Sequence, residues 1–149
     1  MGARHDPSVL KQLAAVRRVQ RLQAEMTLAA AEAAIRRLET RRGEAETVRD
    51  DHMARWGRVI AEPALGLSVA GACAAAVAHS ESALAELAGE LVHARSDKDD
   101  KLRALSVARA REDVAEDTAR KAGRVERRAR EQHRLSELAD VASRRRARP

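Results

Sequence analysis

The sequence has 149 residues, of which 29 are Lys or Arg and 23 are Asp or Glu, so its net charge is +6. It contains no Phe or Tyr and a single Trp, whereas compact cores usually draw on aromatic side chains. A thick globular core is therefore disfavoured. A disordered chain is also disfavoured, because Ala, Leu, Arg and Glu are abundant and are strong helix formers. The composition predicts an all-α protein whose long helices share a narrow apolar seam.

Features that would direct the chain to a membrane or an oxidising compartment are few. The single Cys73 cannot form an intramolecular disulfide bond. The longest uncharged apolar stretch, Val69–Ala78, has about half of the roughly 20 residues that a membrane-spanning helix needs. The N-terminus also lacks the apolar core of a signal peptide. We therefore expect a soluble, cytoplasmic protein without a membrane span.

The first predicted helix covers about residues 8–61. Asp6 can cap its start, and Pro7 is tolerated in a first helical turn. Apolar residues then recur three or four positions apart, which is the spacing of one helix face. The stripe comprises Leu10, Leu13, Val16, Val19, Leu22, Met26, Leu28, Ala31, Ile35 and Leu38. Because this stripe drifts around the helix and contains much alanine, it is not a strict heptad zipper.

One convincing break interrupts the helical pattern, at about residues 62–67. Pro63 lacks a backbone donor and restricts the residue before it, and Gly66 follows at short range. Since neither long helix can bury its apolar stripe alone, a short turn here favours antiparallel pairing of the two helices. Residues whose numbers add to about 130 should then face each other. Everything after about residue 130 should extend past the start of the first helix.

The second predicted helix covers about residues 68–142 and precedes a basic tail, residues 143–149. Ser68 can cap its start, and Ser96 with Asp99 resembles a capping box that would allow a kink or a new helix start. Farther along, a seven-residue repeat is readable in two columns. One column holds Val107, Val114, Lys121, Arg128, Leu135 and Ala142, and the other holds Arg111, Thr118, Val125, Gln132 and Ala139. Because half of these positions are polar, the repeat suits a slender two-stranded coil or an unpaired helix.

The predicted fold is thus a single long antiparallel two-helix coiled-coil hairpin over residues 1–149, with an uneven charge distribution. Residues 1–24 have a net charge of +4, residues 120–149 of +7, and the residues between them of −5. The end that holds both termini is therefore basic, and the part near the turn is acidic. A partner's electric field would orient such a protein before contact.

The sequence contains no recognisable catalytic or metal-binding constellation. Gly66 and Gly71 have the spacing of a phosphate-binding loop, but Ala72 stands where that loop requires lysine. The five histidines share no i, i+4 spacing, and Cys73 has no second thiol, so no zinc site is visible. The acidic residues 97–100 lack the glycine and terminal glutamate of a calcium loop and are expected to cap a helix. We expect a protein that is not an enzyme and has no cofactor or metal.

Two segments resemble the FliJ/YscO family, the coiled-coil stalk proteins of flagellar and virulence type III secretion. Residues 10–38, LKQLAAVRRVQRLQAEMTLAAAEAAIRRL, are similar to the family's opening helix in their leucine, arginine and alanine rhythm. Residues 130–146, REQHRLSELADVASRRR, resemble the family's ending, with an Arg-Glu-Gln group, an acidic-hydrophobic-alanine step and a basic tail. The central residues 62–82 are richer in small side chains than the family leads one to expect.

This resemblance implies a non-enzymatic stalk in bacterial flagellum biogenesis or protein transport by type III secretion. Family members are hairpins similar to the shaft of rotary ATPases, engage the hexameric export ATPase and the cytoplasmic part of the export gate, and escort export chaperones. The implied location is cytoplasmic and peripheral to the inner-membrane export apparatus. Carried onto this chain, the implied partner-binding residues are Leu13, Arg17, Arg18, Arg130, Glu131, Gln132, Leu135, Leu138 and Ala139.

Two other functional classes fit the same composition. A basic helical nucleic-acid-binding protein would use the arginines on phosphates, although no aromatic residues are interleaved for stacking on bases. A generic structural or chaperone-like coiled coil is the other alternative. Co-purification with a hexameric ATPase separates the stalk hypothesis from both.

Overall fold

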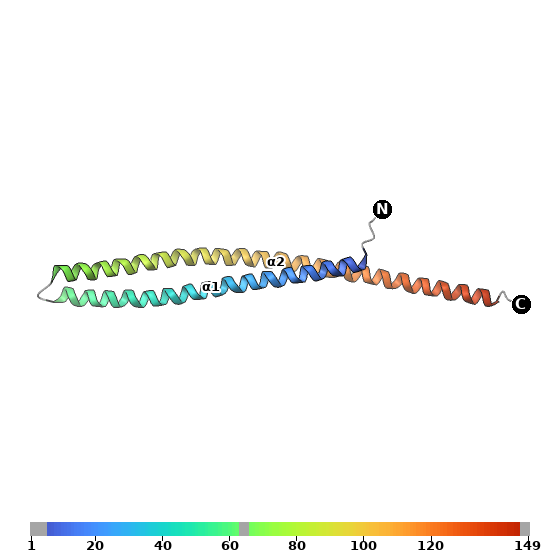
Figure 1. Cartoon of the computed structure of the whole chain (residues 1–149), viewed down its shortest axis with the longest axis horizontal. Coiled ribbons are helices and arrows are strands. Elements are labelled where there is room, and N and C mark those ends of the chain that lie inside the picture. Colours follow the sequence, from blue (N-terminus) through green and yellow to red (C-terminus); the bar gives the residue numbers. More distant parts are fainter. Residues whose placement is uncertain (1–5, 63–65, 147–149) are drawn as a thin grey trace. The chain divides into compact units, whose positions relative to one another are not determined.

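The computed structural model describes residues 6–62 and 66–146, with side chains described as far as residue 144. It contains two α-helices, α1 (Pro7–Ala61) and α2 (Leu67–Arg146), and no strand within these ranges. The helices run antiparallel and pack against each other (Figure 1). The predicted all-α helical hairpin is therefore confirmed. Helix α2 continues four residues beyond the predicted helix end, into the segment expected to be a basic tail.

The N-terminus of α1 is capped as its sequence indicates. Asp6 accepts a hydrogen bond on Oδ1 from the backbone N–H of Ser8, at 2.9 Å. The Asp6 carbonyl accepts two further bonds, from the N–H groups of Val9 and Leu10. These bonds satisfy backbone donors that have no partner in a first helical turn. Pro7 occupies the first helical position, where its missing N–H costs nothing.

The start of α2 differs from the sequence-based expectation. The Gly66 carbonyl accepts hydrogen bonds from the N–H groups of Val69 and Ala70, both at 3.0 Å, so Gly66 is the capping residue. Ser68 already lies inside the helix and does not cap it. Glycine is tolerated at this position because it adopts non-helical backbone angles without a steric penalty. The predicted turn residues Pro63, Ala64 and Leu65 lie outside the described residues.

Helix α2 is unbroken through residues 93–99, where a capping box allowed a new helix start. Two of the acidic residues in this region pair with basic side chains on their own helix and do not cap a terminus, because no helix terminus lies here. Asp97 lies 3.4 Å from Lys101, and Asp100 lies 3.2 Å from Arg103. Spacings of three and four place such pairs next to each other on a helix surface, where they support a continuous helix.

The chain forms two compact units, each made of one segment from α1 and one from α2. Unit 1 consists of residues 1–25 and 104–149, and unit 2 consists of residues 26–103. In unit 2 the buried apolar side chains are mostly small or medium in size; they are Ala31, Cys73, Val77, Leu87 and Leu91. In unit 1 they are Leu105 and Ala115. No large side chain in the described parts of the chain is less than 2% exposed, so the seam is shallow.

Cross-helix polar pairs fix the register of the hairpin. In unit 2, His52 and Ser80 face each other, and their residue numbers add to 132. In unit 1, Arg21 faces Glu112, and these numbers add to 133. Both values are close to the sum of about 130 that the position of the break predicts.

One 18-residue stretch of α2 is apolar enough, by length and composition alone, to be considered as a membrane span. Its mean hydropathy is 1.2, and 17% of it is buried within the described structure. Length and composition alone are weak evidence for a membrane span, because signal sequences and mostly buried core helices of soluble proteins also pass this test.

Candidate partner-binding surface

All nine predicted partner-binding residues lie in unit 1. Three are on α1, namely Leu13, Arg17 and Arg18, and six are on α2 between residues 130 and 139. The hairpin register places Leu13 opposite a residue near 120, so the α1 group lies beside an earlier stretch of α2. The two groups therefore form neighbouring parts of one unit rather than a single cluster.

The C-terminal part of α2 has no opposing helix within unit 1. By the register of Arg21 and Glu112, the first residue of α1, Pro7, faces α2 near residue 126. Every side chain from residue 127 to residue 144 is exposed. We call residues 127–144 the unpaired end of α2. Leu135 and Leu138, at 67% and 66% exposure, leave on it an apolar surface that the rest of unit 1 does not cover.

Arginines flank this apolar surface. Arg127, Arg130, Glu131 and Arg134 line a shallow depression of about 240 Å³. Arg130 forms an ion pair with Glu126 one turn earlier, so Glu126 partly neutralises the charge of Arg130 within the helix. The unpaired end of α2 thus offers leucines beside a mostly basic edge, an arrangement suited to an acidic partner surface.

A groove lies between α1 and α2 in the paired part of unit 1, before the unpaired end of α2 begins. Its volume is about 430 Å³, and apolar side chains and two arginines line it. The lining residues are Leu13 and Arg17 of α1 with Val107, Ala110, Arg111, Val114, Ala115 and Thr118 of α2. We call it the unit 1 groove. No acidic side chain is among these residues.

A network of four charged residues crosses the helix pair beside this groove. Arg21 contacts Glu25 at 2.8 Å and Glu112 at 2.5 Å, and Arg109 reaches Glu25 at 3.1 Å. Hydrogen bonds from Arg109 and Arg21 hold the pKa of Glu25 below its ordinary value. Hydrogen bonds to Glu25 and Glu112 raise the pKa of Arg21. Glu112 is only 8% exposed, so this carboxylate depends on Arg21 for compensation of its charge.

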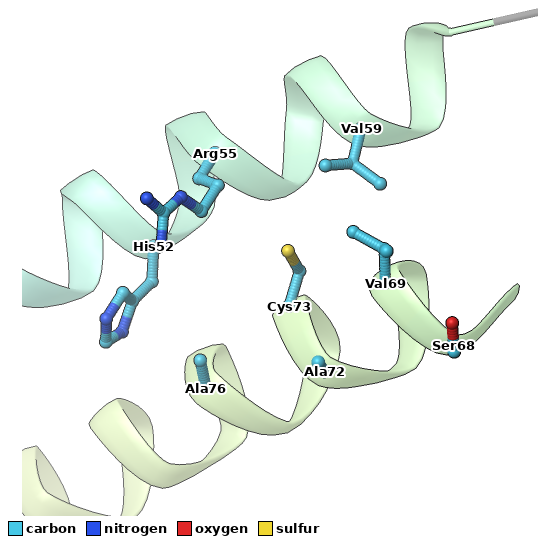
Figure 2. Close-up of a pocket in the computed structure, with 8 residues that line it drawn as sticks. All are labelled: His52, Arg55, Val59, Ser68, Val69, Ala72, Cys73 and Ala76. Atoms are coloured by element: carbon cyan, nitrogen blue, oxygen red, sulfur yellow. The ribbon is translucent and has the colours of Figure 1, made fainter. Parts of the chain in front are cut away.

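Unit 2 contains a second groove, near the turn, with a volume of about 440 Å³. Figure 2 shows the sulfur of Cys73 directed toward α1 between Arg55 and Val59. Close by, His52 Nδ1 lies 2.7 Å from Ser80 Oγ, whose hydroxyl donates to the Ala76 carbonyl. This bonding gives Nδ1 the donor role, so the pair is satisfied and structural. None of the predicted partner-binding residues lines this groove.

Metal binding has no structural basis in the described ranges, 6–62 and 66–146. They bring together no group of three or more His, Cys, Asp or Glu side chains able to hold a metal ion. Cys73 is buried as a free thiol without a second cysteine.

Sequence reasoning did not include the α2 wall of the unit 1 groove among the candidate binding residues. Val107, Arg111, Val114 and Thr118 belong to the seven-residue repeat, which was the signal that could have identified them. Periodicity shows which residues share a helix face but not whether a partner helix covers that face. No family model, curated protein or solved structure matches the chain.

Proposed function

We propose that this protein is a non-enzymatic central-stalk component of a flagellar or virulence type III protein export apparatus. In this role it engages the hexameric export ATPase and the cytoplasmic part of the export gate, and it escorts export chaperones. It acts in the cytoplasm, next to the inner membrane. The resemblance of residues 10–38 and 130–146 to the FliJ/YscO family motivates this proposal.

The observation that carries the proposal is the unpaired end of α2. It is a helix that extends past the start of its partner, with Leu135 and Leu138 exposed on its surface. Helices normally bury such side chains against a neighbour, and an exposed apolar surface in a basic setting marks an interaction site. A single helix of this kind is slender enough to enter the pore of a ring-shaped partner.

The charge distribution supports the same assignment. Unit 1 carries 18 basic against 10 acidic residues, a net charge of +8, whereas unit 2 has a net charge of −2. A partner with an acidic pore would attract unit 1 and orient it before contact. Arginine at the edge of the apolar surface would then increase the association rate more than the final affinity.

The decisive experiment measures binding and activity of a purified hexameric export ATPase, the partner that the proposal requires. The full-length protein should co-purify with the hexamer and stimulate ATP hydrolysis, and deletion of residues 130–149 should abolish both effects. The variant Val92→Asp, at a comparably exposed position in unit 2, should retain them. Equal stimulation by the full-length and truncated proteins would remove the unpaired end of α2 from the mechanism.

Nucleic-acid binding is the second candidate, because Arg127, Arg130 and Arg134 gather at one depression. It predicts sub-micromolar binding of duplex DNA that weakens steeply as salt is added. If the protein binds the ATPase but shows no such binding of DNA, the nucleic-acid-binding function is excluded. A generic structural coiled coil would show neither activity.

A further inference from the structure

The seven-residue repeat of α2 lies on a face that α1 does not cover. Val107 and Val114 are 48% and 68% exposed, and farther along the same repeat Val125 and Leu135 are each 67% exposed. By contrast, Leu105 and Glu112 are only 4% and 8% exposed. We call the exposed face, which runs from Val107 to Ala142 through the two columns of the repeat, the outer repeat.

Helical geometry explains why the valines of the outer repeat are exposed while Leu105 and Glu112 are buried. Leu105 and Glu112 are seven residues apart and face α1, and Val107 and Val114 follow each of them by two residues. Two residues correspond to about 200° around a helix axis, so the valines lie on a different face of α2. The outer repeat is therefore a second seam of mixed apolar and basic character, with six of its eleven positions apolar, and is not buried in the hairpin's own interface.

The unit 1 groove gives this seam a second wall. Leu13 and Arg17 of α1 line one side, and Val107, Arg111 and Val114 of the outer repeat line the other. A third helix placed along the outer repeat would bury Val114 and Leu13 together. A helix in a groove between two helices is a common mode of protein recognition, with apolar anchors three and four residues apart.

Charge decides between the possible occupants of this seam. Arg111, Lys121 and Arg128 occupy positions of the outer repeat, and no carboxylate in the described part of the chain pairs with Arg111 or Arg128. A second copy in parallel would set each of these bases against itself. An antiparallel copy centred between Arg124 and Val125 would set Lys121 against Arg128. Like charges facing each other oppose association, so a second copy is disfavoured in these two arrangements, whereas a helix with carboxylates opposite Arg111 and Arg128 is favoured.

We propose that the outer repeat is a docking seam for an acidic amphipathic helix of another protein. The apolar side of that helix covers Val107, Val114 and Leu135, and its carboxylates face Arg111 and Arg128. This inference goes beyond the proposed function, because it names the recognition element of a partner and holds whether or not that partner is an ATPase.

The test uses a synthetic peptide of about 35 residues, with leucine at the first and fourth positions of each heptad and glutamate at the flanking positions. A scrambled peptide of the same composition is the control. Fluorescence anisotropy with the full-length protein should show binding of the patterned peptide that is tighter by at least about tenfold, or about 1.4 kcal/mol. Equal binding of both peptides would reduce the effect to general charge attraction and overturn the proposal.

Two matched pairs of variants locate the site. Val114→Asp should weaken peptide binding by about tenfold or more, whereas Val92→Asp, at nearly the same exposure in unit 2, should not. Arg111→Glu should weaken binding of the glutamate peptide, and a lysine version of the peptide should recover affinity for this variant. Arg58→Glu in unit 2 is its charge-matched control. Circular dichroism of each variant should show the same helical signal as the wild-type protein.

Two results would contradict the proposal at this stage. One is unchanged peptide affinity in Val114→Asp, which would place the peptide elsewhere. The other is a wild-type dimer in sedimentation analysis that Val114→Asp converts to a monomer, which would make a second copy the occupant. If the patterned peptide binds at this seam while the ATPase neither binds nor responds, the docking seam stands and the proposed stalk function fails.

Discussion

Leu91 is the most deeply buried of the apolar core residues, at 3% exposure, and its replacement tests how much a shallow helical seam contributes to stability. Leu91→Ala removes three carbon groups from contact with α1. At about 0.8 kcal/mol for each buried group, the loss of transfer free energy is about 2.4 kcal/mol. Because a seam between only two helices lies close to water, the space left behind adds little. We expect the free energy of unfolding to fall by about 2–3 kcal/mol, the lower part of the range for such changes.

The matched control is Leu102→Ala, on the same helix and in the same unit. Leu102 is 51% exposed, and alanine is the stronger helix former, so the expected change is less than about 0.5 kcal/mol. Urea titrations followed by circular dichroism at the helical minimum measure both variants. If the two free energies of unfolding agreed within about 0.5 kcal/mol, burial in this seam would not be the source of stability.

Three further outcomes follow from particular residues. A methyl group added at Gly43 or at Gly89 would meet no atom within 4 Å, and both positions lie in mid-helix. Because alanine is the stronger helix former, Gly43→Ala and Gly89→Ala should each raise the free energy of unfolding, measured by urea titration, by about 0.5–1 kcal/mol. Hydrogen bonds from Arg109 and Arg21 hold the pKa of Glu25 below the ordinary value that it has in the unfolded chain. The stabilisation from these ion pairs is therefore complete above that ordinary value and disappears as pH falls through the lowered pKa. Thermal melting at a series of acidic pH values should show the loss, and Glu25→Gln should lack it. Leu135→Asp should leave the urea midpoint of unfolding unchanged, because Leu135 is 67% exposed. The same variant should abolish co-purification with the ATPase of the proposed function. A lower urea midpoint would show that the unpaired end of α2 supports the hairpin.

The sequence was sufficient to predict the helical hairpin because its helix-forming residues and its helix-breaking residues indicate the same fold. Strong helix formers fill both long segments, and Pro63 with Gly66 provides the one place where the chain can reverse. The position of this break then sets the register, which the facing pair Arg21 and Glu112 confirms to within a few residues. Asp6 was recognisable as a cap because its side chain precedes a proline-initiated helix.

The packing faces could not be predicted to the same extent. Val16, Val19 and Met26 belong to the predicted apolar stripe, yet they are 53%, 53% and 72% exposed. On α1 the buried apolar residue is instead Ala31, and Arg21 pairs with the buried Glu112 across the helices. Alanine and charged residues are also common on solvated helix faces. In a two-helix protein each helix meets one neighbour, so an apolar residue on another face stays exposed unless a partner binds there.

The order in which the hairpin closes has a consequence for binding. The pair His52 and Ser80 is separated by 28 residues of chain, and the pair Arg21 and Glu112 by 91. Closing the longer loop directly costs about 1 kcal/mol more in chain entropy, so contacts near the turn form first and pairing advances from there. Unit 1 is then the last to close and the first to open. A protein that binds unit 1 would therefore slow the earliest step of unfolding. On binding, the amide hydrogens of unit 1 should gain more protection from exchange than those of unit 2.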